Sequence, residues 1–249
     1  MLPVGVLLSA VLLGGCSDGT AGIGTAPSGS LSGPPSGSPP ASAEPATDAS
    51  ATAGSRTPAA PGTTPAAKPS NSTGWTVTVY YTAVASLHTG TAEKVTGCPK
   101  LDCTKGHDDL GSYPSDFVQA VKDEGAGRIS TGKYLNWSYD TGYWLDTAAR
   151  DTAGRQLVPF SSAAADRDVL KAGTRFSITQ CGTDDGGATI AAAVCAKLKD
   201  ARWTITDEFT PGLGGSHHVD AYIGEETSKD FTNSDWYTTL HKATLSINR

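Results

Sequence analysis

A sharp change in composition near residue 74 constrains this chain more than any other feature of its sequence. Residues 17–74 are almost entirely Ala, Pro, Ser, Gly and Thr, whereas all five Trp and all eight Tyr lie in residues 75–249. A segment with so few large apolar side chains cannot bury enough surface to offset the entropy lost on ordering. We therefore predict a disordered linker over 17–74 and one folded domain over 75–249, which is long enough for a hydrophobic core.

Residues 1–16 are typical of a lipoprotein signal peptide. Residues 2–13 are mostly apolar but too few to span a bilayer, and Leu13-Gly14-Gly15-Cys16 fits the cleavage pattern before an acylated cysteine. An ordinary secretory signal peptide is the alternative. We expect Cys16 to carry acyl chains such as palmitate, so that the linker tethers the domain to the extracytoplasmic face of the cell membrane. The small-residue-rich linker suggests the surface of a Gram-positive bacterium.

Four further cysteines, Cys98, Cys103, Cys181 and Cys195, lie in the folded part. An even number in an exported domain favours disulfides, and four cysteines allow three pairings. We favour Cys98–Cys103 and Cys181–Cys195, because each pair brackets a short insertion rich in Gly, Asp and Lys. Zinc is the alternative, but the second pair is too widely spaced for a zinc knuckle. We therefore expect no metal and no cofactor.

Charge and motifs exclude several classes of function. The formal net charge is −6 and no basic stripe is present, which disfavours nucleic acid as a partner. The sequence contains no Gly-x-Ser-x-Gly nucleophile elbow, no P-loop and no His-Glu-x-x-His zinc motif. Candidate chemistry therefore rests on carboxylates, in a chain that we expect to be a monomer.

Short strands separated by turns dominate the expected secondary structure of the folded part. Period-two alternation predicts strands over 75–85, 175–179, 203–206, 219–223 and 243–247, with an aromatic hairpin over 139–148 that bends at Gly142. We expect a loop over 97–111. Helices are expected after Pro114, with Ser115 as N-cap and Gly125 as the stop, and over 188–198. This pattern favours a mainly β fold, a small barrel with insertions.

The segment 205–222 carries the most informative carboxylates. Asp207 ends an apolar strand before a glycine-rich loop, and Asp220 lies between apolar neighbours on the next strand. Asp220 and His218 are two residues apart and share a strand face, so His218 is a candidate substrate contact, whereas His217 points to the opposite face. Two loop histidines in solvent are the alternative.

Three stretches of this sequence resemble the domain family named for three aspartates, which also forms the C-terminal domain of membrane-bound lytic transglycosylase A. The first Asp of the family matches Asp166, in Ala164-Ala165-Asp166-Arg167-Asp168-Val169-Leu170-Lys171-Ala172-Gly173-Thr174. Asp207 matches the second, and Asp220, followed by Ala221-Tyr222, matches the third. Val79-Tyr80-Tyr81-Thr82-Ala83 resembles the family's first strand. In this sequence Lys171 replaces a usual Pro, and Glu208-Phe209-Thr210-Pro211 replaces the usual glycines after the second Asp.

The resemblance implies a six-stranded double-psi β-barrel, similar to those of expansins, and a role in peptidoglycan. It assigns the general acid/base to Asp220, with Asp207 and Asp166 in support. A single acid suffices to cleave a glycan without water, if burial and a nearby like charge raise its pKa. Tyr81 and Trp144 are the aromatic side chains that we expect in the cleft, stacked on sugar rings. A wall-binding module without turnover and an envelope adaptor are the alternatives.

Overall fold

The computed structural model describes residues 69–248, and the predicted signal peptide, Cys16 and nearly all of the linker lie outside them. The strands are β1 (Ser70–Val84), β2 (Ala92–Gly97), β3 (Asp108–Pro114), β4 (Ala126–Arg128), β5 (Tyr134–Ser138), β6 (Gly142–Asp146), β7 (Ser162–Ala164), β8 (Arg175–Gln180), β9 (Trp203–Asp207), β10 (His218–Glu225) and β11 (Leu240–Asn248). The helices are α1 (Ser115–Glu124), α2 (Ala192–Asp200) and two 3₁₀ turns, η1 (Ala85–Leu87) and η2 (Phe231–Asn233).

Six of these strands close into a barrel. They pair in the ring β1–β10–β7–β9–β8–β11 and back to β1. The pairs β1–β10 and β7–β9 are parallel, and the other four are antiparallel. If β1, β7 and β8 are exchanged with β9, β10 and β11, respectively, the list of parallel and antiparallel pairs stays the same. This pseudo-twofold pairing is that of the expected double-psi barrel, so the predicted fold is confirmed.

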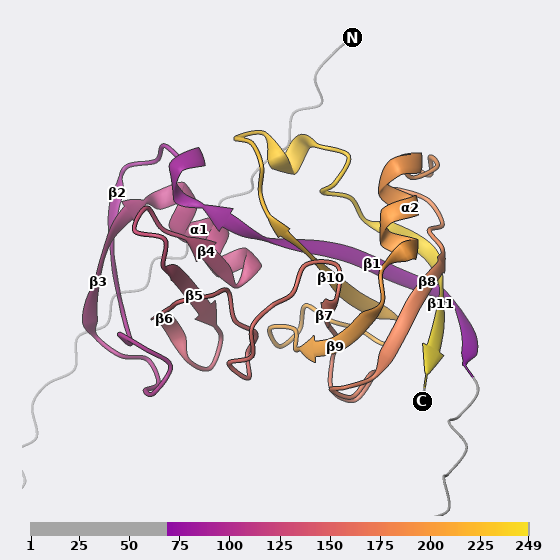
Figure 1. Ribbon diagram of the computed structural model, residues 1–249, viewed down its shortest axis with the longest axis horizontal. Helices are drawn as coiled ribbons and strands as arrows, with labels where there is room; N and C mark the ends of the chain where they lie inside the picture. Colours follow the sequence, from indigo (N-terminus) through magenta and orange to yellow (C-terminus); the bar gives the residue numbers. More distant parts are fainter. Residues whose placement is uncertain (1–68, 249) are drawn as a thin grey trace, which may run out of the picture. The chain divides into compact units, whose positions relative to one another are not determined.

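The chain between β1 and β7 forms an insertion beside the barrel. The sheet continues from β1 through β4 and β5 to β6, while β2 and β3 form a separate two-stranded sheet. Strand β1 runs from the barrel, with β8, β11 and α2, to the insertion, with α1 and β2–β6 (Figure 1). Because β1 belongs to both parts, it fixes the barrel and the insertion relative to each other.

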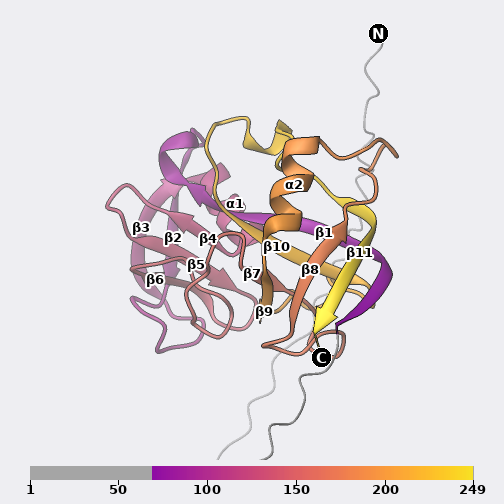
Figure 2. The same ribbon diagram turned by 45° about the vertical axis from the view of Figure 1, so that its right-hand side comes forward.

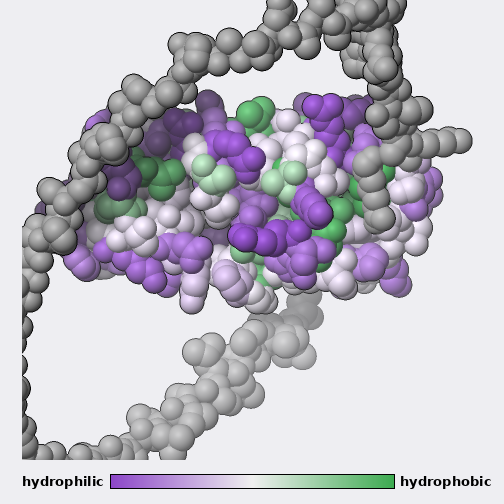
Figure 3. All heavy atoms as spheres, turned by 90° about the horizontal axis from the view of Figure 1, so that it is seen from below, coloured by the Kyte–Doolittle hydropathy of each residue, from purple (hydrophilic) through white to green (hydrophobic). Residues whose placement is uncertain are grey.

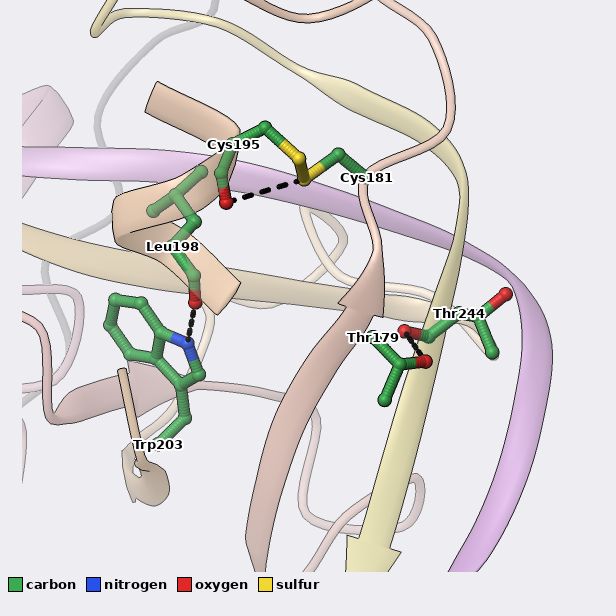
Figure 4. The surroundings of a disulfide bond; sticks show 6 residues. All are labelled: Thr179, Cys181, Cys195, Leu198, Trp203 and Thr244. Carbon is green, nitrogen blue, oxygen red and sulfur yellow. Dashed lines mark hydrogen bonds between the residues drawn. A yellow bond between two sulfur atoms is a disulfide. The ribbon is translucent and has the colours of Figure 1, made fainter. Parts of the chain in front are cut away.

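The barrel core contains the inward-facing side chains of alternating strand positions. Val77, Val219 and Ala221 are fully buried, as is Trp203, whose ring stacks on Phe176 with centroids 6.3 Å apart. Helix α2 covers the strand β8 side of the barrel (Figure 2). The Trp203 indole donates a 3.2 Å hydrogen bond to the Leu198 carbonyl near the end of that helix (Figure 4). The Trp203 ring of β9 therefore contacts both β8, through Phe176, and the end of α2.

Both disulfides are those that we favoured. Cys98–Cys103 closes a short loop after β2, and Cys181–Cys195 joins the end of β8 to α2 (Figure 4). Within residues 69–248, the structure contains no group of three or more His, Cys, Asp or Glu side chains that could hold a metal ion.

The boundaries of several elements differ from the sequence-based expectation. Strand β1 begins at Ser70 rather than 75, because residues 70–73 pair with β11. Ser115 is the first residue of α1 and not its N-cap, since Pro114 occupies the cap position. Gly125 ends that helix as expected, at φ 87° with its N–H on the Val121 carbonyl. Within residues 69–248, no helix has the length and apolar character needed to cross a bilayer.

Candidate functional site: a cleft between barrel and insertion

A row of outward-facing side chains crosses four barrel strands. In register, Asp207 of β9 pairs with Ala164 of β7, Ala164 pairs with Asp220 of β10, and Asp220 pairs with Thr78 of β1. The neighbours of Asp220 on its strand, Val219 and Ala221, are fully buried in the core. Because strand side chains alternate between faces, Asp220 points outward from the barrel, toward the insertion.

The row opens into a cleft with a volume of about 630 Å³. The barrel side is formed by residues of β1, β7, β9, β10 and the loop after β9, and the insertion side by the end of α1 and the β5–β6 hairpin. The side chains of Asp166, Asp207 and Asp220 all line this cleft. The three carboxyl groups that the sequence singled out therefore converge in one open groove.

Asp220 is the most electrostatically perturbed of the three. Its Oδ1 is buried and has no hydrogen-bond partner in the structure. Burial raises the pKa of Asp220 to about 7; the nearby Asp207 carboxylate adds to the rise, and a Thr78 hydrogen bond opposes it. Near neutral pH this carboxyl group is thus poised to give or take a proton.

Asp207 is held firmly by its neighbours. Its Oδ1 accepts backbone N–H groups of Thr152 and Glu208, each at 2.9 Å, and the Tyr80 hydroxyl donates to Oδ2 at 3.5 Å. Burial raises its pKa, while these N–H donors oppose the rise. Asp207 therefore acts as a fixed group that adjoins Asp220 and joins the loop before β7 to the end of β9.

Asp166 lies at the glycine-rich loop. A Cβ added to Gly214 would come within 2.2 Å of both Asp166 carboxylate oxygens. A side chain at position 214 would therefore force this carboxylate to move. Glu208, one of the residues that stand in place of the family's usual glycines, forms an ion pair with Arg167. This pair connects the same two segments at the surface.

His218 lies in the cleft and His217 does not. The His218 ring is half-buried beside Phe209, with ring centroids 4.6 Å apart, and its Nε2 is 2.9 Å from the Thr78 hydroxyl. Burial lowers the pKa of His218. His217 instead packs against Trp75. The expectation that His218 shares the face of Asp220 agrees with the structure.

Two aromatic expectations require correction. Trp144 is 1% exposed inside the insertion, and Tyr81 is 4% exposed and packs against Phe231 and Tyr237, so neither lines the cleft. Tyr81 follows Tyr80, which points to the opposite face of β1, and Trp144 pairs with the buried Asn136, whereas Trp137 is the next residue along β5 and points the other way. The aromatic side chains that do line the cleft are Tyr80, Trp137, Tyr139, Phe209 and Tyr237.

A cleft residue that the sequence motifs missed is Glu124, the last residue of α1. Burial raises its pKa to about 8, and the Asp220 carboxylate contributes. A carboxylate at a helix C-terminus faces the negative end of the helix dipole, which is an unfavourable position. In the sequence, the feature that could have indicated a role for Glu124 was its unfavourable position directly before Gly125, which ends the helix.

Most of the large hydrophobic side chains that are exposed within residues 69–248 border the cleft. On the face seen in Figure 3, hydrophilic residues are interspersed with smaller hydrophobic groups. Three of the five large hydrophobic side chains that are exposed within the described part border the cleft: Tyr139, Leu213 and Tyr237. Apolar surface near the carboxyl groups suits a ligand with apolar ring faces.

No family model and no curated protein matches this chain. Similar solved structures include Escherichia coli MltA with bound chitohexaose, at 14% identity and a TM-score of 0.45, covering 71% of each chain. A membrane-bound lytic murein transglycosylase from Agrobacterium tumefaciens is 12% identical with a TM-score of 0.45, covering 73% of this chain and 76% of its own. The Burkholderia pseudomallei lytic transglycosylase LtgG is 9% identical with a TM-score of 0.33, covering 71% of each. All three of these proteins are lytic transglycosylases.

Proposed function

We propose that this protein binds peptidoglycan glycan strands in the cleft and cleaves them as a lytic transglycosylase, with Asp220 as the single general acid/base. One observation carries the proposal: a carboxyl group with a pKa of about 7, one oxygen of which is buried and unpartnered, lines a groove between two parts of the fold. Such a group is protonated in a useful fraction near neutral pH.

The chemistry requires only one carboxyl group, used twice. Protonated Asp220 gives its proton to the glycosidic oxygen as the bond from that oxygen to the anomeric carbon breaks. The resulting carboxylate then takes the proton from the sugar's own C6 hydroxyl, whose oxygen bonds to the anomeric carbon and closes a 1,6-anhydro ring. No water is consumed, and Asp220 ends in its starting protonated form.

The second carboxyl group of the cleft argues against ordinary hydrolysis. Hydrolysis needs an ionised carboxylate as nucleophile or base beside the acid. Burial raises the pKa of Glu124 to about 8, so this second carboxyl group is also largely uncharged near neutral pH. Asp207 is occupied by two backbone N–H groups. In this proposal Asp207 supports the charge state of Asp220, and Asp166 and His218 contact the glycan.

Digestion of purified sacculi tests the proposal directly. We expect soluble muropeptides that end in a 1,6-anhydro sugar and that take up no oxygen-18 from labelled water, measured by mass spectrometry. Products with reducing ends that carry the label would identify a hydrolase instead. Protein that sediments with sacculi and releases nothing would favour the wall-binding module, and protein that does not sediment would favour an adaptor.

The pH dependence of cleavage follows from the acid role. Because Asp220 must be protonated to begin the reaction, we expect the rate at subsaturating substrate to be nearly constant below pH 7. Above pH 7 it should fall about tenfold per unit as the carboxyl group ionises. Initial rates on sacculi from pH 5 to 9 check this sign. A rate that rises through pH 7 would contradict an acid with this pKa.

We also propose that the protein acts outside the cytoplasm and is anchored through Cys16. The two disulfides support an oxidising compartment. Replacing Cys16 by Ala should move the protein from the membrane fraction into the soluble or secreted fraction and abolish labelling by radioactive palmitate, both read by gel and blot. Unchanged membrane association would contradict the lipid anchor.

A further inference from the structure

Glu124 and Asp220 belong to opposite sides of the same cleft. Glu124 is the last residue of α1 in the insertion, and Asp220 lies on β10 of the barrel. The Asp220 carboxylate contributes to the raised pKa of Glu124, so the two groups interact electrostatically across the groove. A ligand that reaches Asp220 therefore passes along a second carboxyl group.

A gap in strand pairing fixes the orientation of the Glu124 side chain. Along one edge of β1, pairing with β11 ends at Val77 and pairing with β4 begins at Thr82. In this gap the backbone N–H of Tyr81 donates to Glu124 Oε2 at 3.2 Å. The Tyr237 hydroxyl donates to Oε1 at 3.1 Å, and Tyr237 itself lines the cleft. One oxygen is thus committed to the backbone, while the other lies beside a cleft residue.

The surroundings of Glu124 favour its uncharged form. Burial is the largest cause, Asp220 and the neighbouring Asp123 add like charge, and the C-terminal end of the helix dipole acts in the same direction. The Tyr81 N–H and the Tyr237 hydroxyl oppose the rise. Lys122, the basic residue in the last turn of α1, is exposed to solvent.

The hydrogen bonds also locate the acidic proton. The Tyr81 N–H can only donate, so the stronger acceptor, the carbonyl oxygen, belongs at Oε2, and the proton belongs on Oε1, whose O–H can donate while its oxygen still accepts from Tyr237. An uncharged carboxylic acid donates one O–H, whereas a carboxylate only accepts. On the cleft side, neutral Glu124 therefore offers a donor, beside the Tyr237 hydroxyl.

We propose that Glu124 is a positioning residue, which donates its carboxylic O–H to a neutral acceptor of the bound sugar, such as an acetamido carbonyl, and so sets the sugar opposite Asp220. This inference rests on the proposed function, because it presumes a glycan in the cleft. It assigns the insertion a part in binding that the three aspartates of the barrel do not supply.

Binding of a hexamer of N-acetylglucosamine in the Asp220→Asn background tests the inference without turnover. Between pH 5 and 10, we expect the affinity of this parent to be constant at low pH and to fall about tenfold as Glu124 ionises. Glu124→Gln keeps an amide donor on the cleft side and an acceptor for Tyr81. Its affinity should therefore stay within about threefold of the parent's low-pH affinity and should not fall at alkaline pH. Glu124→Ala should lose about tenfold at pH 6, as expected for one hydrogen bond.

Glu93→Gln provides a matched control, because this exposed acid lies on β2 of the same insertion and does not line the cleft. It should follow the parent at every pH. A pH titration of the Glu124 carboxyl by carbon-13 NMR supplies a readout that does not depend on sugar. We expect its midpoint at a higher pH than that of an exposed glutamate.

The outcomes separate the two proposals. If the folded parent binds no hexamer at any pH, the proposed function fails and this inference fails with it. If the parent binds but Glu124→Gln retains the alkaline decline, or Glu124→Ala binds equally well, only the role of Glu124 is overturned. The inference is also overturned if the NMR titration of the Glu124 carboxyl has its midpoint at the pH that is ordinary for glutamate, whatever the sugar affinity.

Discussion

Replacing Asp220 by Asn is expected to reduce the release of anhydro-muropeptides by about 10³-fold or more. The amide is nearly isosteric but cannot deliver a proton to the glycosidic oxygen or take one from the C6 hydroxyl, and general acid/base catalysis contributes about 10²–10⁴-fold. Initial rates on purified sacculi at pH 6 measure the loss. Sedimentation with sacculi should persist, because the cleft keeps its shape.

Thermal melting distinguishes lost chemistry from lost folding in this variant. A carboxyl group whose pKa is raised in the folded protein destabilises that fold as pH rises from the ordinary value through about 7, since the folded state binds its proton more tightly. Asn removes this term. At pH 8 the variant should therefore melt at the same temperature as the unaltered protein or higher. Substantial residual cleavage by a well-folded Asp220→Asn protein would remove Asp220 from the reaction.

Replacing Trp203 by Ala is expected to cause the largest loss of stability. The ring is fully buried, stacks on Phe176 and donates to the Leu198 carbonyl of α2. Deleting a core Trp costs about 3–5 kcal/mol of unfolding free energy. For a domain of this size, that corresponds to a decrease of about 10 °C in melting temperature. Differential scanning calorimetry at pH 6 measures both quantities.

Two matched substitutions check the cause of this loss. Trp203→Phe keeps most of the apolar volume but loses the indole donor, so its loss should be clearly smaller than that of the Ala variant. Val158→Ala changes a half-exposed side chain, and we expect a change within about 0.5 kcal/mol. A Trp203→Ala protein that melts within a few degrees of the unaltered protein would contradict the assignment of this ring to the core.

Local sequence patterns specified most of the barrel. Alternation in β1, β8, β9, β10 and β11 is a property of neighbouring residues, so each strand could be predicted before its partners were known. The positions of Gly125 and of the paired cysteines were equally local signals. The start of β1 was not predictable, because Ser70–Thr73 is polar and becomes a strand only through its pairing with β11.

The aromatic assignments failed for a reason of phase. A strand exposes alternate residues, and the sequence 79–82 is apolar or hydroxylated on both faces, so it did not reveal that Tyr80 rather than Tyr81 lines the cleft. In the β5–β6 hairpin, Trp144 pairs with Asn136 and both are buried, whereas Trp137, the next residue of β5, pairs with Tyr143 and lies at the cleft. Which face is buried depends on what packs against the hairpin.

The sequence by itself indicated the main barrel strands, favoured one of the three possible cysteine pairings, and placed Asp207 at the end of one strand and Asp220 within the next. These are consequences of composition and short-range periodicity. Only the tertiary structure decided that the three carboxyl groups share one cleft, and that Glu124 of a distant helix lies in that cleft with them. The physical reason is that strand pairing and burial join residues far apart in the chain, and a pKa depends on those neighbours rather than on adjacent residues.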